Sequence, residues 1–104
     1  MTYSIIRLLD NKIVYEKTFN HLSGDHDGSW LNLKHNLVIT SFNRPNSGKI
    51  FCLDAAKDKL YISEDIEGRF DVGSNTFDYL SVYMWNKPVI QKLYFERDFE
   101  IIKL

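Results

Sequence analysis

Short runs of alternating apolar and polar residues, separated by turn residues, dominate this sequence. Successive side chains of a β-strand point to opposite faces, so a period of two is the pattern of a half-buried strand. The runs are rich in Ile, Val, Leu, Tyr and Phe, which favour strands. No stretch of ten residues has an apolar stripe with helix caps at both ends. The pattern therefore predicts an all-β fold with little or no helix.

About eight or nine short strands follow from this alternation. The apolar faces of so many strands need two layers to cover them, and a chain of 104 residues can bury one core without disulfides. We predict a single domain, residues 1–104, folded as an antiparallel β-sandwich or a small barrel. The expected strands cover residues 4–9, 12–19, 30–33, 37–42, 49–54, 59–63, 78–85, 89–96 and 99–104.

Turn residues predict how neighbouring strands pair. In three hairpins the turn and the apolar face agree on one register. Turns of two, three and four residues, at 10–11, 34–36 and 55–58, would place Leu8 opposite Ile13, Leu33 opposite Leu37, and Leu53 opposite Leu60.

The hairpin over residues 78–96 has two possible registers. With a two-residue loop, Leu80 and Val82 face the core, and a stripe of aromatic side chains lies on the outer face. A three-residue loop buries that stripe instead, because a slip of one residue reverses every side chain. The stripe consists of Tyr79, Tyr83 and Trp85. Both registers remain open at this point.

Composition favours a cytoplasmic protein without nucleic-acid or membrane partners. One cysteine, Cys52, cannot form an internal disulfide, which fits a reducing compartment. We find no secretion signal, and no apolar run is long enough to cross a membrane. The net charge of −1, from 13 basic and 14 acidic residues, does not support a nucleic-acid footprint.

No set of residues indicates a catalytic or metal site. Asp25 and Asp27 before Gly28 resemble a fragment of a calcium loop, but the Glu that would complete the loop is missing. The three histidines, His21, His26 and His35, do not have the spacing of zinc ligands. Cys52 alternates with apolar neighbours, as a packing residue does. We expect no metal, no cofactor and no enzyme; a small enzyme using His21 or His26 is the weaker alternative.

Acidic residues are concentrated in the two longest predicted connections, 21–29 and 64–77. The segment 64–78 has five acidic residues against Arg69, a local charge of −4 that leaves +3 for the rest of the chain. Such segments attract a basic partner and repel phosphates. The acids that we select are Asp25, Asp27, Glu64, Asp65, Glu67 and Asp71.

Aromatic residues are numerous, with seven Phe, six Tyr and two Trp. Exposed Tyr and Trp side chains often dominate protein interfaces. We therefore select Trp30, Tyr83 and Trp85 as candidate anchors for a partner.

In overall character the chain resembles the small immunity proteins of bacterial polymorphic-toxin and contact-dependent inhibition systems. The resemblance implies an antitoxin that neutralises a cognate basic toxin, commonly a nuclease, by occluding its active site. The partner-binding residues would be Asp25, Asp27, Trp30, Glu64, Asp65, Glu67, Asp71, Tyr83 and Trp85. By default such a protein is a monomer.

The alternative function is a carbohydrate-binding β-sandwich module. Sugar rings stack on aromatic side chains, while carboxylates and amides bind their hydroxyl groups. The stacking platform would consist of Trp30, Tyr79, Tyr83 and Trp85, and the hydroxyl-binding groups of Asp25, Asp27 and Asn32.

Overall fold

A computed structural model describes residues 1–22, 28–32, 37–42, 47–85 and 87–104; of residues 28–32 and 47 it describes only the backbone. These residues form eleven β-strands and no helix, so the predicted all-β class is confirmed. Accordingly, the described residues contain no helix that could cross a membrane.

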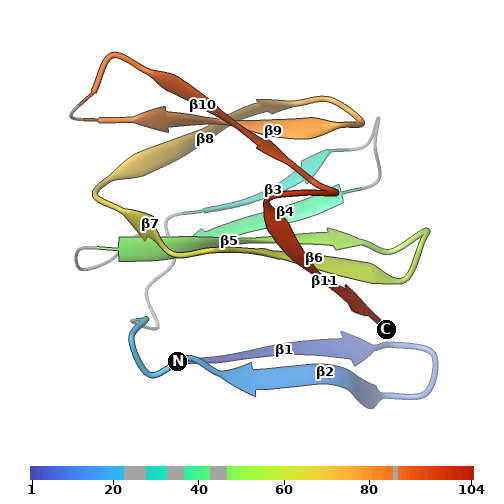
Figure 1. Ribbon diagram of the computed structural model, residues 1–104. Helices are drawn as coiled ribbons and strands as arrows, with labels where there is room; N and C mark the ends of the chain where they lie inside the picture. Colours follow the sequence, from blue (N-terminus) through green and yellow to red (C-terminus); the bar gives the residue numbers. More distant parts are fainter. Residues whose placement is uncertain (23–27, 33–36, 43–46, 86) are drawn as a thin grey trace.

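The strands form three layers (Figure 1). The lowest layer in Figure 1 is a hairpin of β1 (Thr2–Arg7) and β2 (Lys12–Thr18). The central sheet has the order β11-β6-β5-β4-β3, with β7 paired to β5 beside that path. Its strands are β3 (Gly28–Asn32), β4 (Leu37–Phe42), β5 (Ser47–Asp54), β6 (Lys59–Ser63), β7 (Ile66–Glu67) and β11 (Phe99–Lys103).

The uppermost layer is a three-stranded sheet in the order β10-β9-β8. Its strands are β8 (Phe70–Asn75), β9 (Tyr79–Met84) and β10 (Ile90–Tyr94). All neighbouring strands in the three sheets run antiparallel, as the sequence predicts.

Apolar side chains fill both gaps between the layers, because the central sheet is covered on both faces. Between it and the three-stranded sheet lie Leu37, Ile39, Ile50, Cys52, Tyr61, Phe70, Leu80, Val82, Leu93, Phe95 and Phe99. Between it and the hairpin lie Phe19, Leu22, Phe42, Phe51, Leu60 and Ile62. Neighbouring residues of β5 serve different cores: Phe51 faces the hairpin, and Cys52 faces the three-stranded sheet. The unbroken apolar run of β5 is the consequence of this two-sided burial.

One hairpin prediction is confirmed, and the structure decides the register that the sequence left open. Leu53 lies opposite Leu60, as the four-residue turn predicts. In the upper sheet Tyr83 pairs with Ile90 and Leu80 with Leu93, which is the register of the two-residue loop. The aromatic stripe of β9 therefore lies on the outer face of the molecule.

The predicted register of the first hairpin is wrong. Ile13 pairs with Ile6 instead of Leu8, and a bulge follows Ile5. The turn has four residues, 8–11, so both leucines leave the strand. Asp10 stabilises the longer turn: its side chain binds Arg7 and accepts a hydrogen bond from the backbone N–H of Lys12.

The second hairpin also differs from its prediction, by one residue. Asn32, and not Leu33, is the partner of Leu37, which brings Trp30 opposite Ile39. Residues 33–36, which include the predicted turn, lie outside the described residues.

The prediction of a long connection over residues 64–77 is wrong as well, because β7 and β8 lie there. Asp71, Gly73 and Asn75 disfavour strands, so β8 has a weak local signal. It forms because pairing with β9 buries Phe70 and partly buries Val72 against the upper core.

Candidate protein-binding surface

The outer face of the three-stranded sheet exposes aromatic side chains. We call it the aromatic face; its residues are Tyr79, Tyr83, Trp85, Ile90 and Tyr94. Alternation along β9 produces it: Leu80 and Val82 point into the core and are fully buried, whereas Tyr83 is 44% and Trp85 62% exposed. Apolar side chains that remain exposed together often mark an interaction surface.

Trp85 is held in place although its ring is exposed. Its Nε1 donates a hydrogen bond to Asp71 Oδ2 at 2.6 Å. The Arg69 guanidinium lies over the ring, with Cζ 5.3 Å from the ring centroid, which is a cation–π contact. The backbone N–H of Trp85 donates to the carbonyl of Arg69 at 3.0 Å. The ring is therefore oriented before any partner arrives.

Tyr83 lies across the backbone of β8 at Gly73. A Cβ atom at Gly73 would be 2.1 Å from Tyr83 Cε2, far inside contact distance. Glycine is therefore the residue that leaves room for this ring. Asp71 is the register partner of Tyr83, so its carboxylate belongs to the same face.

The other half of the aromatic face has two further cation–π contacts. The rings of Tyr79 and Tyr94 are 5.4 Å apart. Lys92 Nζ lies 4.8 Å from the Tyr79 centroid, and Arg97 Cζ lies 4.7 Å from the Tyr94 centroid. Both tyrosines are half-buried, so this half of the face is the more closely packed.

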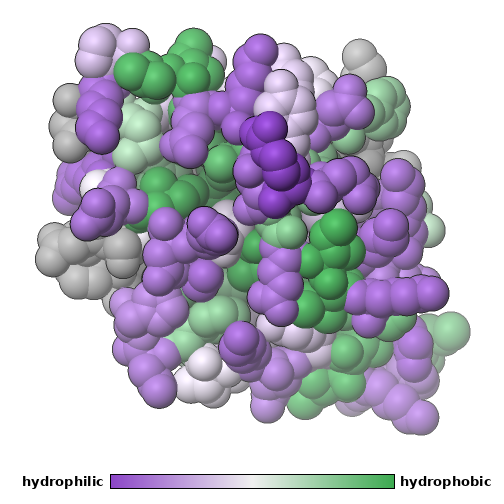
Figure 2. Space-filling model, in the orientation of Figure 1, coloured by the Kyte–Doolittle hydropathy of each residue, from purple (hydrophilic) through white to green (hydrophobic). Residues whose placement is uncertain are grey.

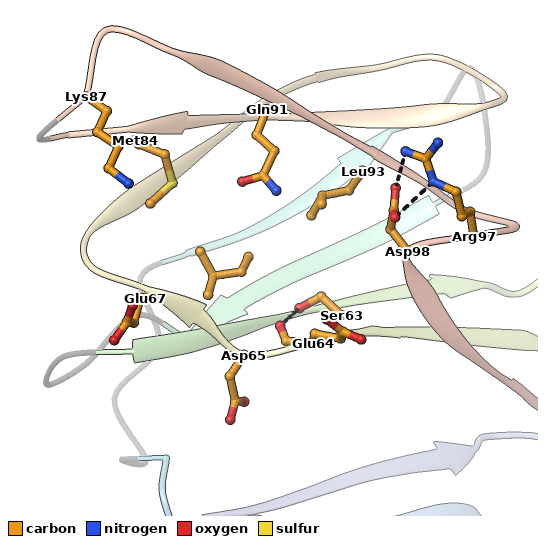
Figure 3. Close-up of a pocket in the computed structure, with 11 residues that line it drawn as sticks. Ser63, Glu64, Asp65, Glu67, Met84, Lys87, Gln91, Leu93, Arg97 and Asp98 are labelled. Carbon is orange, nitrogen blue, oxygen red and sulfur yellow. Dashed lines mark hydrogen bonds and ion pairs between the residues drawn. The ribbon is translucent and has the colours of Figure 1, made fainter.

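A cleft of about 320 Å³ opens between the three-stranded sheet and the central sheet (Figure 3). Gln91 and Leu93 of β10 line its upper side, and Ser63 and the residues after it line the lower side. Arg97 pairs with Asp98 at 3.1 Å at one end. Hydrophilic residues cover most of the molecule on this side (Figure 2). The cleft is thus a polar hollow with groups of both charges.

The predicted acidic segment does not form a single surface. Glu64 and Glu67 are exposed and line the cleft. Asp65 points away from it in Figure 3, and its Oδ1 lies 2.9 Å from His21 Nε2 and 3.1 Å from Lys49 Nζ. Asp71 belongs to the aromatic face. Asp65 therefore joins the β1–β2 layer to the central sheet.

Of the nine predicted site residues, the structure brings together Asp71, Tyr83 and Trp85. Trp30 lies on β3, at the edge of the central sheet and hence in another layer. Asp25 and Asp27 lie outside the described residues, as do His26 and His35. Sequence reasoning missed the supporting residues Arg69 and Gly73, because only the pairing of β8 with β9 reveals them.

In the part of the chain that the structure describes, no three His, Cys, Asp or Glu side chains are grouped as metal ligands would be. Cys52 is fully buried, and its burial raises the pKa of the thiol. A thiol of this kind is a packing residue and a poor nucleophile.

The contact around Asp65 leads to a prediction about acid stability. Desolvation raises the pKa of this carboxyl, but hydrogen bonds from His21 and Lys49 outweigh it and hold the pKa below its usual value. A depressed pKa stabilises the fold above about pH 4, the value in the unfolded chain, and this contribution is lost as the pH falls through the folded-state pKa. We expect Asp65→Asn to lower the free energy of unfolding at pH 7 by at most about 1 kcal/mol, since the pair is half exposed.

Urea unfolding between pH 7 and pH 2 measures this effect. The difference between Asp65→Asn and wild type should shrink below pH 4. Glu64→Gln removes the same charge from the neighbouring, exposed residue and serves as the control. A gap between Asp65→Asn and wild type that stays constant down to pH 2 would contradict the assignment.

Compared with known proteins, the chain matches no protein-family model, no curated protein and no solved structure.

Proposed function

We propose that the chain is an immunity protein: a protein-binding inhibitor that neutralises a cognate basic toxin, a nuclease, by covering its active site. The observation that supports this proposal most is the exposed pair of Tyr83 and Trp85 beside the carboxylate of Asp71, which holds the Trp85 ring in place. Tryptophan and tyrosine are the residues most often found as energetic hot spots of interfaces.

Fixed aromatic side chains favour tight binding for an entropic reason. A side chain that is already oriented loses little freedom when a partner covers it. Asp71 of the neighbouring strand β8 places a carboxylate beside both rings, where a lysine or arginine of a basic protein would be accepted. Hot spots of this type mainly slow the dissociation of a complex.

Exposed acids beside the hot spot would speed association with a basic partner. Glu67 lies two residues before Arg69, which contacts Trp85, and Glu64 lines the same cleft. Glu67 is therefore close in the chain to the residue that contacts Trp85, whereas Glu64 lies farther along the cleft, on the side of Asp98 (Figure 3).

The test is co-expression in bacteria of the tagged chain with the product of the gene next to its own. We expect a stoichiometric complex that survives moderate salt and in which the toxin is inactive. Glu64→Lys/Glu67→Lys should lower the association rate several-fold and flatten its dependence on salt. The control, Glu16→Lys/Glu100→Lys, changes the net charge equally at residues of β2 and β11 that do not line this cleft. Equal effects of both variants would show that only net charge matters, and the absence of a complex would refute the proposal.

A carbohydrate-binding module is the second candidate, favoured by the solvent-exposed rings of Tyr83 and Trp85 on one sheet face. Trp30, another residue of the predicted platform, lies on β3 of the central sheet and not on the three-stranded sheet. A glycan screen that follows tryptophan fluorescence distinguishes the two candidates. A fluorescence change with a sugar that Trp85→Ala abolishes, in a protein that forms no complex, would favour the carbohydrate module.

A further inference from the structure

The turn between β1 and β2 carries the two large apolar side chains with the highest exposed fractions among the described residues. Leu8 is 91% and Leu9 is 92% exposed, and Ile6 and Ile13 beside them are also exposed. We call these four residues the leucine tip. Leu8 and Leu9 gain almost no burial from the fold of this chain, and apolar side chains that are exposed together often mark an interaction surface.

The turn holds the leucines outward. Arg7 Nε and Nη2 donate to the two carboxylate oxygens of Asp10 at 3.0 and 2.8 Å, and the backbone N–H of Lys12 donates to the same carboxylate at 3.3 Å. Asn11 adopts the left-handed conformation, with φ of 56°, that closes the turn. Behind the tip, the stacking of Tyr3 on Phe51 at 4.2 Å fixes the hairpin to the central sheet. The tip is thus a preformed projection.

The size and shape of the leucine tip argue against a second copy of the chain as its occupant. A stable protein interface uses about 20–30 residues on each side. Four residues at the end of a hairpin offer far fewer, and a convex projection cannot pack flat against its own copy. A fluid lipid surface needs no matching pocket, because acyl chains and headgroups move aside for an apolar projection.

Charge is distributed in the way that an anionic surface would attract. The β5–β6 turn and the end of β11 lie at the same end of the molecule as the leucine tip (Figure 1). Leu104 N donates to Asp58 O there at 2.8 Å. The charged side chains of the β1–β2 turn, the β5–β6 turn and the end of β11, with the strand residues next to them, are Arg7, Lys12, Lys57, Lys59 and Lys103 against Asp10, Asp54 and Asp58, a net charge of +2. The other residues then have 8 basic and 11 acidic side chains, a net charge of −3.

We propose that the leucine tip inserts into the interfacial region of an anionic lipid surface, with the neighbouring lysines on the phosphate groups. Insertion of two leucines with a few basic contacts gives weak, reversible attachment. The aromatic face belongs to the opposite outer layer of the molecule, so it stays accessible in this orientation. The inference departs from the expectation, drawn from composition, that the protein has no membrane partner, and it is independent of the proposed inhibitor function.

The test is flotation of the protein with vesicles of phosphatidylcholine alone and of phosphatidylcholine with phosphatidylglycerol. We expect binding to the anionic vesicles that weakens with added salt, and at least tenfold less binding of Leu8→Ser/Leu9→Ser. The matched control is Phe77→Ser/Val89→Ser, which removes two exposed apolar side chains from the turns at the two ends of β9, outside the aromatic face. That control should bind vesicles like wild type, whereas Leu8→Ser/Leu9→Ser should still bind the toxin.

A label on the tip gives a second measurement. Leu9→Cys can carry a polarity-sensitive dye selectively, because Cys52 is fully buried. Its emission should shift to the blue with anionic vesicles. Absence of vesicle binding, unchanged binding of Leu8→Ser/Leu9→Ser, or an unshifted dye would overturn the proposal. A wild-type dimer that Leu8→Ser/Leu9→Ser converts into a monomer would overturn it in favour of a second copy.

Discussion

Replacement of Phe51 by alanine is expected to lower the free energy of unfolding by about 3–5 kcal/mol. Phe51 is fully buried between the central sheet and the hairpin. Its ring stacks on Tyr3 and meets the rings of Phe19 and Phe42 edge-on, at 5.4 and 5.6 Å. Because the total stability of a small domain is about 5–15 kcal/mol, this loss is a large part of it. Urea unfolding measures the change.

The alanine variant should loosen the hairpin before it affects the upper core, because Phe51 faces only the lower core. Tyr3 reports this loosening. Its burial raises the pKa of the Tyr3 phenol to about 12. Since this folded-state pKa exceeds the unfolded value of about 10, Tyr3 stabilises the fold below pH 10, and that contribution is lost as the pH rises to about 12. In Phe51→Ala we expect the Tyr3 titration to move back toward pH 10.

Ultraviolet titration of the tyrosines follows this change, with Tyr3→Phe to identify the group. Phe77→Ala is the matched control, because Phe77 is 75% exposed and its removal should cost less than about 1 kcal/mol. A loss below 1 kcal/mol in Phe51→Ala would contradict the position of the hairpin on the central sheet.

Agreement between the turn residues and the apolar face does not by itself fix the register of a hairpin. In β5 and β6 the apolar run and the four-residue turn agree, and the register of Leu53 with Leu60 is confirmed. In β1 and β2 the turn residues and the apolar face also agreed, on Leu8 opposite Ile13, but Ile6 is the partner of Ile13. A side-chain contact of Asp10 with Arg7 favours a longer turn instead, and such a contact is not visible in an apolar pattern.

Strand β8 shows a different limit. Its residues lack strand propensity, and only the partner strand β9 makes them pair. The residues of β8 alone cannot indicate this pairing. Phe70 is buried by side chains of other strands in the upper core, which are distant in the sequence. The sequence also failed to predict the third layer. A two-layer fold assumes one apolar face for each strand, whereas β5 and β6 have apolar side chains on both faces.

The candidate site was predictable only in part. Alternation along β9 groups Tyr83 with Trp85, but two registers were possible until the pairing with β10 was known. The grouping of acids by sequence failed to describe a surface, because Asp65 and Asp71 belong to different layers. Acidic residues that are neighbours in the sequence form one acidic surface only when their side chains lie on the same side of the fold.

Trp85→Ala is expected to weaken binding of the cognate toxin at least 30-fold, about 2 kcal/mol, under the proposed function. The ring is 62% exposed, so its removal should lower the free energy of unfolding by less than about 1 kcal/mol. Calorimetry or surface plasmon resonance gives the dissociation constant, and urea unfolding gives the stability. Phe77→Ala removes another exposed aromatic side chain from the chain segment before β9 and should leave binding unchanged. Equal losses of toxin binding in Trp85→Ala and Phe77→Ala would contradict a special role of Trp85 in binding.

Gly73→Ala tests the same surface without touching an aromatic residue. The added Cβ would be 2.1 Å from Tyr83 Cε2, and because that atom belongs to an exposed ring, the ring can turn away into solvent. We therefore expect little loss of stability but a loss of binding as large as that of Tyr83→Ala. The double variant Gly73→Ala/Tyr83→Ala should bind the toxin no more weakly than Tyr83→Ala, since both changes act through the Tyr83 ring. Ser74→Ala, at the next residue of β8, is the control. Wild-type binding by Gly73→Ala would mean that the position of the Tyr83 ring over β8 has no part in recognition.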